Sequence, residues 1–280
     1  MQNNIKTSFI ELSARERAKN LLDQGSFREL LGPFEHITSP WLAPQGIVTQ
    51  ADDGMVVAKG TIEGEPAVVI AIEGAFQGGS MGEVSGAKMA AALELAAEDH
   101  RKGIPTRAVL SLETGGVRLQ EANLGLAAIA DIHAAITDLR RYTPVIGIIA
   151  GTVGCFGGMS IAAGLCSRLI VTKEARLGLN GPQVIEQEAG IEEYDSRDRP
   201  FIWSMTGGEP RYQTGFADAL VDDSLETVRQ TVIDFIHQGV PERHRSEQYE
   251  SYLAKLSAFD TRQQATRELV ADLLKVEARV

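Results

Sequence analysis

Residues 145–172 read VIGIIAGTVGCFGGMSIAAGLCSRLIVT and hold one complete structural unit of the chain. The unit opens with an apolar, largely β-branched run at 145–150, which favours a buried strand. A glycine-rich turn at 151–159 follows, and the small residues at 157–165 favour a helix. A second apolar run at 168–172 predicts another strand. Strand, turn, helix and strand in this order are typical of α/β proteins.

The same alternation extends toward the N-terminus of the chain. Residues 108–112 form a further apolar run, the segment 119–141 has helical periodicity, and residues 86–100 predict a helix rich in alanine and leucine. Before these lie two runs of β-forming residues at 55–62 and 67–72, and the Glu-Gly-Glu-Pro between them predicts a hairpin. The sequence therefore predicts a hairpin followed by an α/β fold.

Both ends of the chain are predicted to be helical. A capping-box pattern beginning at Ser13 opens a short helix, and residues 27–34 predict a second helical turn. After the last apolar run the chain becomes polar and keeps a helical pattern to its C-terminus. We expect one domain over residues 1–240 and a helical extension at 241–280 that packs on the same domain or on a partner.

The composition excludes several classes of function. With 27 basic and 38 acidic residues the formal net charge is −11, which argues against a nucleic-acid partner. The longest apolar stretch is too short for a bilayer, and residues 1–11 do not resemble a secretory leader. We therefore expect a cytoplasmic protein with no membrane contact. Two cysteines and five histidines without paired spacings predict no disulfide framework and no metal site.

Three glycine-rich turns are candidate ligand-binding segments. The first turn covers residues 73–82 (EGAFQGGSMG), the second residues 113–118 (ETGGVR) and the third residues 151–159 (GTVGCFGGM). The second and third turns each place a Gly-Gly pair where a strand ends and a helix begins, and free N–H groups at such a point attract an oxyanion. Converging amides of this kind suit thioester enolate chemistry, because no side chain has to take part.

Two other interpretations of these turns have less support. Residues 78–82 fit G-x-S-x-G, so Ser80 could be the nucleophile of a hydrolase. Its base and orienting acid would be His237 or His244 and Asp218 or Asp222. Such short patterns recur by chance, and both histidines lie in a segment that reads as exposed helix and turn. No G-x-x-x-x-G-K-[ST] exists, and the GxxGxxGG spacing of the third turn differs from the dinucleotide fingerprint.

Four ordered motifs resemble the carboxyltransferase β subunit of bacterial acetyl-CoA carboxylase. They are GGSMG at 78–82 with GAK at 86–88, TGGVRLQE at 114–121, Gly-Gly at 157–158 and GPQVIEQ at 181–187. The similarity extends over about residues 13–225. It implies an α/β, crotonase-like (ClpP/crotonase) fold, in which ββα units spiral into two stacked sheets as a single carboxyltransferase-type domain.

The sequence departs from that subunit in two ways. It lacks the N-terminal four-cysteine zinc ribbon, and Glu113-Thr114 replaces a serine-rich lead before the Gly-Gly pair. Three longer strings instead resemble the β subunits of biotin-independent malonate decarboxylases, namely EANLGL at 121–126, GCFGGM at 154–159 and LNGP at 179–182. The resemblance therefore favours decarboxylation of a malonyl thioester over biotin-dependent carboxylation.

Membership of that family implies a set of partners. With a homologous γ subunit, the chain would convert malonyl-S-acyl-carrier protein to acetyl-S-acyl-carrier protein and CO2, using backbone oxyanion holes to stabilise the thioester enolate. The δ subunit would be the acyl-carrier protein, whose phosphoribosyl-dephospho-CoA arm carries the substrate, and the α subunit would be the acyl-carrier transferase. The chain itself would hold no covalently bound cofactor.

The resemblance also implies which residues form the site. The amides near the thioester carbonyl would come from the pairs Gly116-Val117 and Gly157-Gly158. The residues expected to bind substrate are Gly78, Gly79, Ser80, Gly115, Arg118, Gln120 and Phe156. Arg118, Gln120 and Glu121 could order the second turn or touch the substrate, and the structural role is favoured because charged residues at a helix start commonly cap or pair locally. Candidates to meet the phosphates of the carrier arm are Lys88, Arg168 and Lys173.

Two alternative functions fit the same motifs. The chain could be the carboxyltransferase half of a biotin-dependent acyl-CoA carboxylase or decarboxylase. It could also be a crotonase-like subunit that positions a partner while catalysis takes place elsewhere. Intact Gly-Gly turns argue against the second of these.

Overall fold

A computed structural model describes residues 6–48, 50–263 and 266–274 of the chain. Within these residues seven strands form one sheet and lie in it in chain order. The strands are β1 (Arg28–Leu30), β2 (Met55–Ile62), β3 (Glu65–Ile72), β4 (Arg107–Ser111), β5 (Val145–Ile149), β6 (Arg168–Thr172) and β7 (Ala219–Val221). The first three strands pair antiparallel, whereas β3 to β7 pair parallel.

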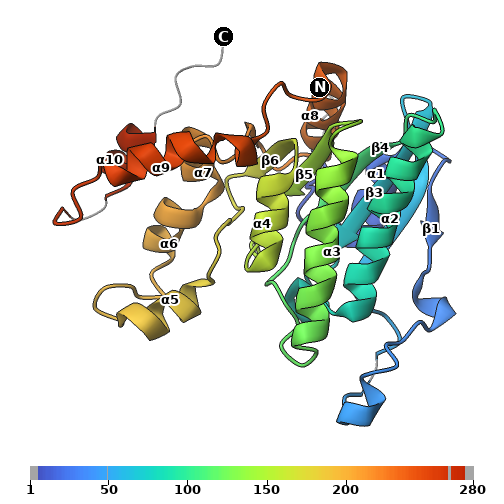
Figure 1. Cartoon of the computed structure of the whole chain (residues 1–280), viewed down its shortest axis with the longest axis horizontal. Helices are drawn as coiled ribbons and strands as arrows, with labels where there is room; N and C mark the ends of the chain where they lie inside the picture. The colour runs from blue at the N-terminus through green and yellow to red at the C-terminus, as the bar shows by residue number, and fades with distance from the viewer. Residues whose placement is uncertain (1–5, 49, 264–265, 275–280) are drawn as a thin grey trace.

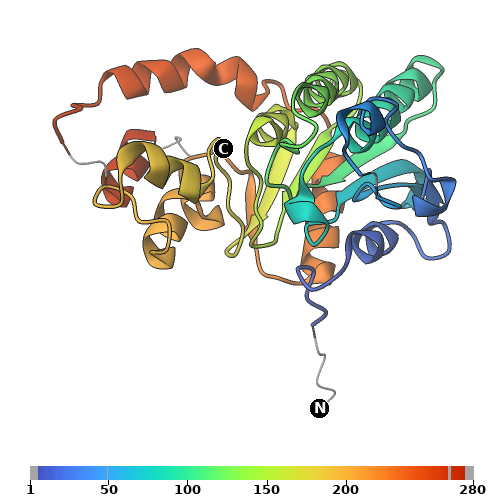
Figure 2. The same ribbon diagram turned by 90° about the horizontal axis from the view of Figure 1, so that it is seen from below.

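Helices cover both faces of this sheet (Figures 1 and 2). On one face lie α2 (Glu83–Arg101), α3 (Asn123–Leu139) and α4 (Gly158–Leu165), side by side. On the other face lie α1 (Ala14–Leu21) and α8 (Leu225–Gln238). Because both faces are covered, the central strands are buried on both sides, which explains why they read as short continuous apolar runs.

The remaining helices gather beyond the β6–β7 end of the sheet (Figure 1). They are α5 (Pro182–Ala189), α6 (Arg199–Thr206), α7 (Gly208–Gln213), α9 (Tyr249–Ser257) and α10 (Arg267–Leu274). The C-terminal helices rest on this group, since α10 contacts α7 and the ring of Tyr252 stacks on Phe216 at 5.1 Å. An ion pair between Arg245 and Asp218, 2.5 Å long, ties the same segment to the start of β7. None of the described helices is long and apolar enough to cross a membrane.

Alternating side chains on the strands build two cores. In β5, Val145 and Ile149 face α2, α3 and α4, whereas Ile146 and Ile148 face α1 and α8. Gly147 lies between them because a Cβ there would come within 2.8 Å of the Leu169 side chain. The period of two along each strand thus determines which side chains fill which layer.

The expected α/β class, the hairpin and the first helix are confirmed. The hairpin strands β2 and β3 pair from Met55 with Ile72 to Ile62 with Glu65. The expected capping box is present, because the Ser13 side chain accepts from the Glu16 N–H and the Glu16 side chain from the Ser13 N–H.

The secondary structure expected from the sequence was wrong or incomplete in two places. Residues 27–34 were expected to form a helical turn, but β1 and the short 3₁₀ helix η1 (Pro33–Glu35) occupy them, because β1 pairs with β2 in the sheet. The edge strand β7 was not expected at all; its three residues are held by pairing with β6. In both cases nonlocal pairing overrides a weak local preference.

The expected second sheet is reduced to single hydrogen-bonded bridges in the described residues. Parallel bridges join Met81 with Val117, Thr114 with Cys155, and Cys155 with Leu177. These bridges link the three glycine-rich turns just beyond the ends of β3, β4 and β5. The second layer of the fold therefore coincides with the candidate site.

Candidate active site

The second and third turns lie against each other. The Thr114 N–H donates to the Gly154 carbonyl at 2.7 Å, and the Phe156 N–H donates to the Thr114 carbonyl at 3.0 Å. Farther along, a Cβ added at Gly157 would lie 3.3 Å from the Gly116 Cα. Both glycines have positive φ, 103° at Gly116 and 61° at Gly157, so a side chain at either would be strained as well as crowded.

The first turn closes the other side of the second. The Gly115 N–H donates to the Gly78 carbonyl at 2.9 Å, and the Met81 N–H donates to the Gly116 carbonyl at 2.8 Å. Gly79 is buried here, and a Cβ on it would collide with the Glu113 carbonyl. The three turns thus form one connected framework of backbone at the ends of three neighbouring strands.

Two of the four expected oxyanion residues keep a free amide. The Gly116 N–H donates to Thr114 Oγ1 at 3.0 Å, and the Gly157 N–H donates to the Leu179 carbonyl at 2.8 Å. By contrast, the N–H groups of Val117 and Gly158 donate no hydrogen bond to any residue that the structure describes. Gly158 is the first residue of α4, where N–H groups have no intrahelical acceptor and the helix dipole favours negative charge.

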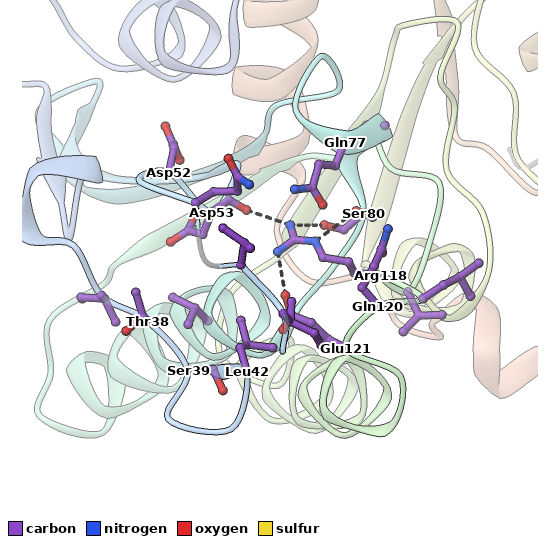
Figure 3. A pocket seen from close by; sticks show the side chains of 18 of the residues that line it. Thr38, Ser39, Leu42, Asp52, Asp53, Gln77, Ser80, Arg118, Gln120 and Glu121 are labelled. Carbon is purple, nitrogen blue, oxygen red and sulfur yellow. Dashed lines mark hydrogen bonds and ion pairs between the residues drawn. The ribbon is translucent and has the colours of Figure 1, made fainter. Parts of the chain in front are cut away.

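A cavity of about 870 Å³ opens beside the first and second turns (Figure 3). Six expected site residues line it, namely Gly78, Ser80, Gly115, Val117, Arg118 and Gln120. Gly79, Gly116, Phe156, Gly157 and Gly158 are not part of its lining. Its outer wall comes from residues 37–48 and 50–53, none of which was expected at the site from the sequence; Thr38, Ser39, Leu42, Asp52 and Asp53 of this wall are labelled in Figure 3. No local motif marks that segment.

Similarity to known proteins identifies the family. Residues 11–273 match the carboxyl transferase domain family. The chain belongs to this family. Over 245 residues it is 42% identical to a malonyl-S-ACP:biotin-protein carboxyltransferase of Malonomonas rubra, covering 84% of this chain and 77% of that protein.

Two solved structures are similar to this carboxyl transferase domain in both sequence and fold. A chain of a Pseudomonas malonate decarboxylase hetero-tetramer in complex with malonate is 67% identical, with a TM-score of 0.93 over 96% of this chain and 98% of that one. A transcarboxylase 12S chain with methylmalonyl-coenzyme A bound is 30% identical, with a TM-score of 0.65 over 79% of this chain and 40% of that one. The crotonase-like carboxyltransferase fold expected from the motifs is thereby confirmed.

Arg118 of the carboxyl transferase domain is engaged inside the protein. Its guanidinium donates to the carbonyls of Ser80 at 2.8 Å and Asp53 at 3.1 Å, and to the Glu121 carboxylate at 2.9 Å (Figure 3). The guanidinium also lies over the Phe76 ring, 5.6 Å from its centre. Arg118 therefore ties the first turn, the second turn and the outer wall together, as the alternative structural interpretation expects.

A second buried ion pair holds the opposite side of the second turn. Arg17 of α1 and Glu113 are 4% and 8% exposed, and 2.5 Å separates Arg17 Nη1 from Glu113 Oε2. Arg17 also donates to the Phe9 carbonyl at 3.0 Å. The Glu113 carboxylate fills the space beside Gly151, where any Cβ would collide with it. The Glu113 side chain thus bridges the second and third turns.

The residues of the hydrolase interpretation are not brought together. Ser80 Oγ accepts a hydrogen bond from Arg118 Nε at 3.2 Å. His237 instead lies 2.8 Å from Glu63, and His244 lies 3.3 Å from Ser167. With each histidine bonded elsewhere, Ser80 has no base beside it.

Lys88 and His133 differ from their expected surroundings, whereas the two cysteines do not. Lys88 is buried and bonded to Asp53 at 2.9 Å and to the Met55 carbonyl at 2.7 Å, so it does not face a ligand. His133, expected on a helix surface, donates from Nε2 to the Gly158 carbonyl at 2.8 Å and so anchors the start of α4. Both cysteines are buried, and burial raises the pKa of the Cys166 thiol to about 12.

Proposed function

We propose that this carboxyl transferase domain is the β-type subunit of a malonate decarboxylase and forms one half of its decarboxylating site. The amides of Val117 and Gly158, which belong to two adjoining turns and donate no hydrogen bond to any described residue, carry the proposal. The similarity to a chain of the Pseudomonas malonate decarboxylase, at 67% identity over nearly the whole chain, supports the reaction assigned to them.

The reaction follows from what two amides can do. When the bond between the malonyl α-carbon and its carboxylate breaks, CO2 leaves and the electron pair spreads over the α-carbon and the thioester oxygen. N–H donors aimed at that oxygen stabilise the enolate more than the substrate, and each contributes about 3–4 kcal/mol to lowering the barrier. A proton then adds to the α-carbon and yields the acetyl thioester. No basic side chain has to begin the sequence.

The substrate would reach these amides on a carrier. The cavity beside the first and second turns has a volume of about 870 Å³, within the range of small-molecule and cofactor sites, and suits an extended thioester arm. In our proposal the acyl end of the phosphoribosyl-dephospho-CoA group of the δ acyl-carrier protein, loaded through the α subunit, enters this cavity.

A γ subunit would complete the site. The Leu119 and Leu179 side chains, which flank the second and third turns, are 81% and 60% exposed. A homologous domain resting on these side chains would bury apolar surface and exclude water from the enolate. This chain covers only 40% of the transcarboxylase 12S chain. The rest of that polypeptide is long enough for such a second domain.

One observation favours a second function. The Malonomonas rubra relative, at 42% identity, is a malonyl-S-ACP:biotin-protein carboxyltransferase, in which the carboxyl group passes to biotin. The first half of both reactions is the same enolate formation. The two proposals therefore differ only in the fate of the carboxyl group, which is either released as CO2 or passed to biotin.

The test is to purify the chain alone and with its γ partner, and to supply malonyl-S-carrier protein with and without a biotinylated protein. We expect the isolated chain to be nearly inactive and the complex to release CO2 at a rate that biotin does not change. Carboxybiotin formation would favour the second function, and full turnover by the single chain would contradict the half-site.

A further inference from the structure

A second cavity, of about 720 Å³, borders the third turn at Thr152 and lies between that turn and helices α5 and α6. Three arginines line it, Arg176, Arg197 and Arg199. Its other lining residues are Gln183, Ser196, Pro200, Ile202 and Trp203. Three guanidinium groups thus surround one hollow in a chain with a net charge of −11.

Arg176 is fixed in place without a counterion. Its Nε donates to the Thr152 carbonyl at 2.9 Å, and its guanidinium lies between the rings of Trp203 and Phe156, 4.8 Å and 5.4 Å from their centres. No carboxylate among the described residues forms an ion pair with it. Burial lowers its pKa, and the positive charge of Arg199 acts in the same direction.

Of the three arginines, Arg197 has a carboxylate partner among the described residues, whereas Arg176 and Arg199 have none. Arg197 pairs with Asp195 at 3.1 Å, and Glu186 lies close enough to influence it. The side chain of Arg199 forms no ion pair or hydrogen bond with any residue that the structure describes. A dianion in this cavity would therefore relieve the repulsion between Arg176 and Arg199.

We propose that this cavity binds a phosphate-bearing anion, such as a phosphate ester or a diphosphate. Guanidinium forks match phosphate oxygens in pairs, and the Gln183 amide adds a further donor. The volume exceeds that of a single phosphate and leaves room for the group that carries it. The first cavity offers no such charge, because its lining carries Asp52, Asp53 and Glu121 and its Arg118 is already bonded.

The position of the cavity gives two possible sources for the anion. Arg176 contacts the carbonyls of Thr152 and Val153, within the same turn that ends at the free Gly158 amide. Phosphates of the carrier arm could reach it during catalysis, an origin that rests on the proposed function. A free phosphorylated metabolite could bind there independently of the reaction.

Binding is measured on the full chain with Trp203 as the reporter. Because the chain has two tryptophans, Trp41→Phe leaves only the one in the cavity. Titration with pyrophosphate, and separately with inorganic phosphate, should change its fluorescence saturably, with weaker binding at higher salt. Arg199→Ala should weaken pyrophosphate binding at least about tenfold, as expected for the loss of a charge-assisted contact.

The matched control is Arg262→Ala, which removes an arginine whose side chain is 89% exposed and lies in another part of the chain. It should leave pyrophosphate binding unchanged. Absence of saturable binding, or equal binding by the Arg199→Ala and Arg262→Ala variants, would overturn the proposal. Neither readout depends on decarboxylase activity, so the proposal can fail while the proposed function stands.

Steady-state kinetics of the assembled complex separate the two sources. If the arm supplies the phosphates, Arg199→Ala raises KM for malonyl-S-carrier protein with little change in kcat, and leaves malonyl-N-acetylcysteamine, which has no phosphate, unaffected. If the ligand is a free metabolite, both KM values stay as in the wild type while pyrophosphate binding is still lost. Either result supports the site, and the pair of KM values assigns its ligand.

Discussion

The second and third turns present one free amide each, but they are held by different forces. The second turn is fixed by buried charge, with Arg17–Glu113 on one side and Arg118–Glu121 on the other. The third turn has no buried ion pair of its own in the described residues and is held by close backbone packing, together with hydrogen bonds from Arg176 to the Thr152 and Val153 carbonyls. A Cβ at Gly154 would come within 2.6 Å of the Arg176 carbonyl.

This difference indicates two ways to position a backbone donor. Buried ion pairs hold a turn through long-range partners, and removing one partner leaves an uncompensated charge. Glycine packing holds a turn through the absence of side chains, so that an added Cβ disturbs it. The second turn should therefore be sensitive to loss of charge, and the third to gain of volume.

The largest expected effect comes from Gly157→Val, which would break the third turn. The residue has a φ of 61°, and its Cβ would lie 3.3 Å from the Gly116 Cα and 3.9 Å from the Val117 nitrogen, beside a free amide. Decarboxylation by the assembled complex should fall at least about a hundredfold, the scale of losing one oxyanion donor. The measurement is kcat with malonyl-S-carrier protein, alongside circular dichroism and complex assembly.

Gly164→Ala is the matched control for this variant. Gly164 lies in helix α4, which begins directly after Gly157, and a Cβ there meets no atom within 4 Å. Its activity should be normal and its stability equal or higher, because alanine is the better helix former. A Gly157→Val complex that assembles and turns over at the wild-type rate would contradict the oxyanion assignment.

An intermediate effect is expected when charge is removed beneath the second turn. Arg17→Met leaves the Glu113 carboxylate buried without its partner and should lower the free energy of unfolding by about 3–5 kcal/mol. The double variant Arg17→Met/Glu113→Leu should lose less than the sum of the two single variants. Urea unfolding of all four proteins measures this coupling.

The exposed pair Arg262–Asp260 provides the comparison, because Arg262→Met should change stability little. If the losses at Arg17 and Glu113 are additive, the pair does not act as a unit. The contrast between a charge-held turn and a packing-held turn would then fail.

The smallest expected effect is that of Ser80→Ala. Among the described residues Ser80 Oγ accepts only from Arg118, whose other hydrogen bonds remain, and His237 and His244 are bonded elsewhere. Catalysis should stay within about tenfold of the wild type, whereas loss of a nucleophile costs several orders of magnitude. Activity that collapses while the fold is retained would revive the hydrolase interpretation and remove both turns from the mechanism.

Much of the fold could be predicted from local pattern. The hairpin of β2 and β3, the helix capped by Ser13, and the strand–turn–helix units around the second and third turns all follow from the spacing of neighbouring residues. The motifs of the three turns also indicate the family. These features depend on contacts close in sequence, where the period of side chains and the conformational freedom of glycine are decisive.

Other features depend on partners distant in sequence, and only the tertiary structure decided them. Which amide of the third turn is free depends on the distant Leu179 carbonyl. This carbonyl accepts a hydrogen bond from the Gly157 N–H and leaves the Gly158 N–H without an acceptor among the described residues. Arg17 and Glu113 are 96 positions apart, and nothing near either residue announces their pairing. By itself, the sequence determined the family and the chemistry it could perform. Folding decided which backbone atoms remain unbonded, because a hydrogen bond made across the structure removes a donor that local pattern leaves available.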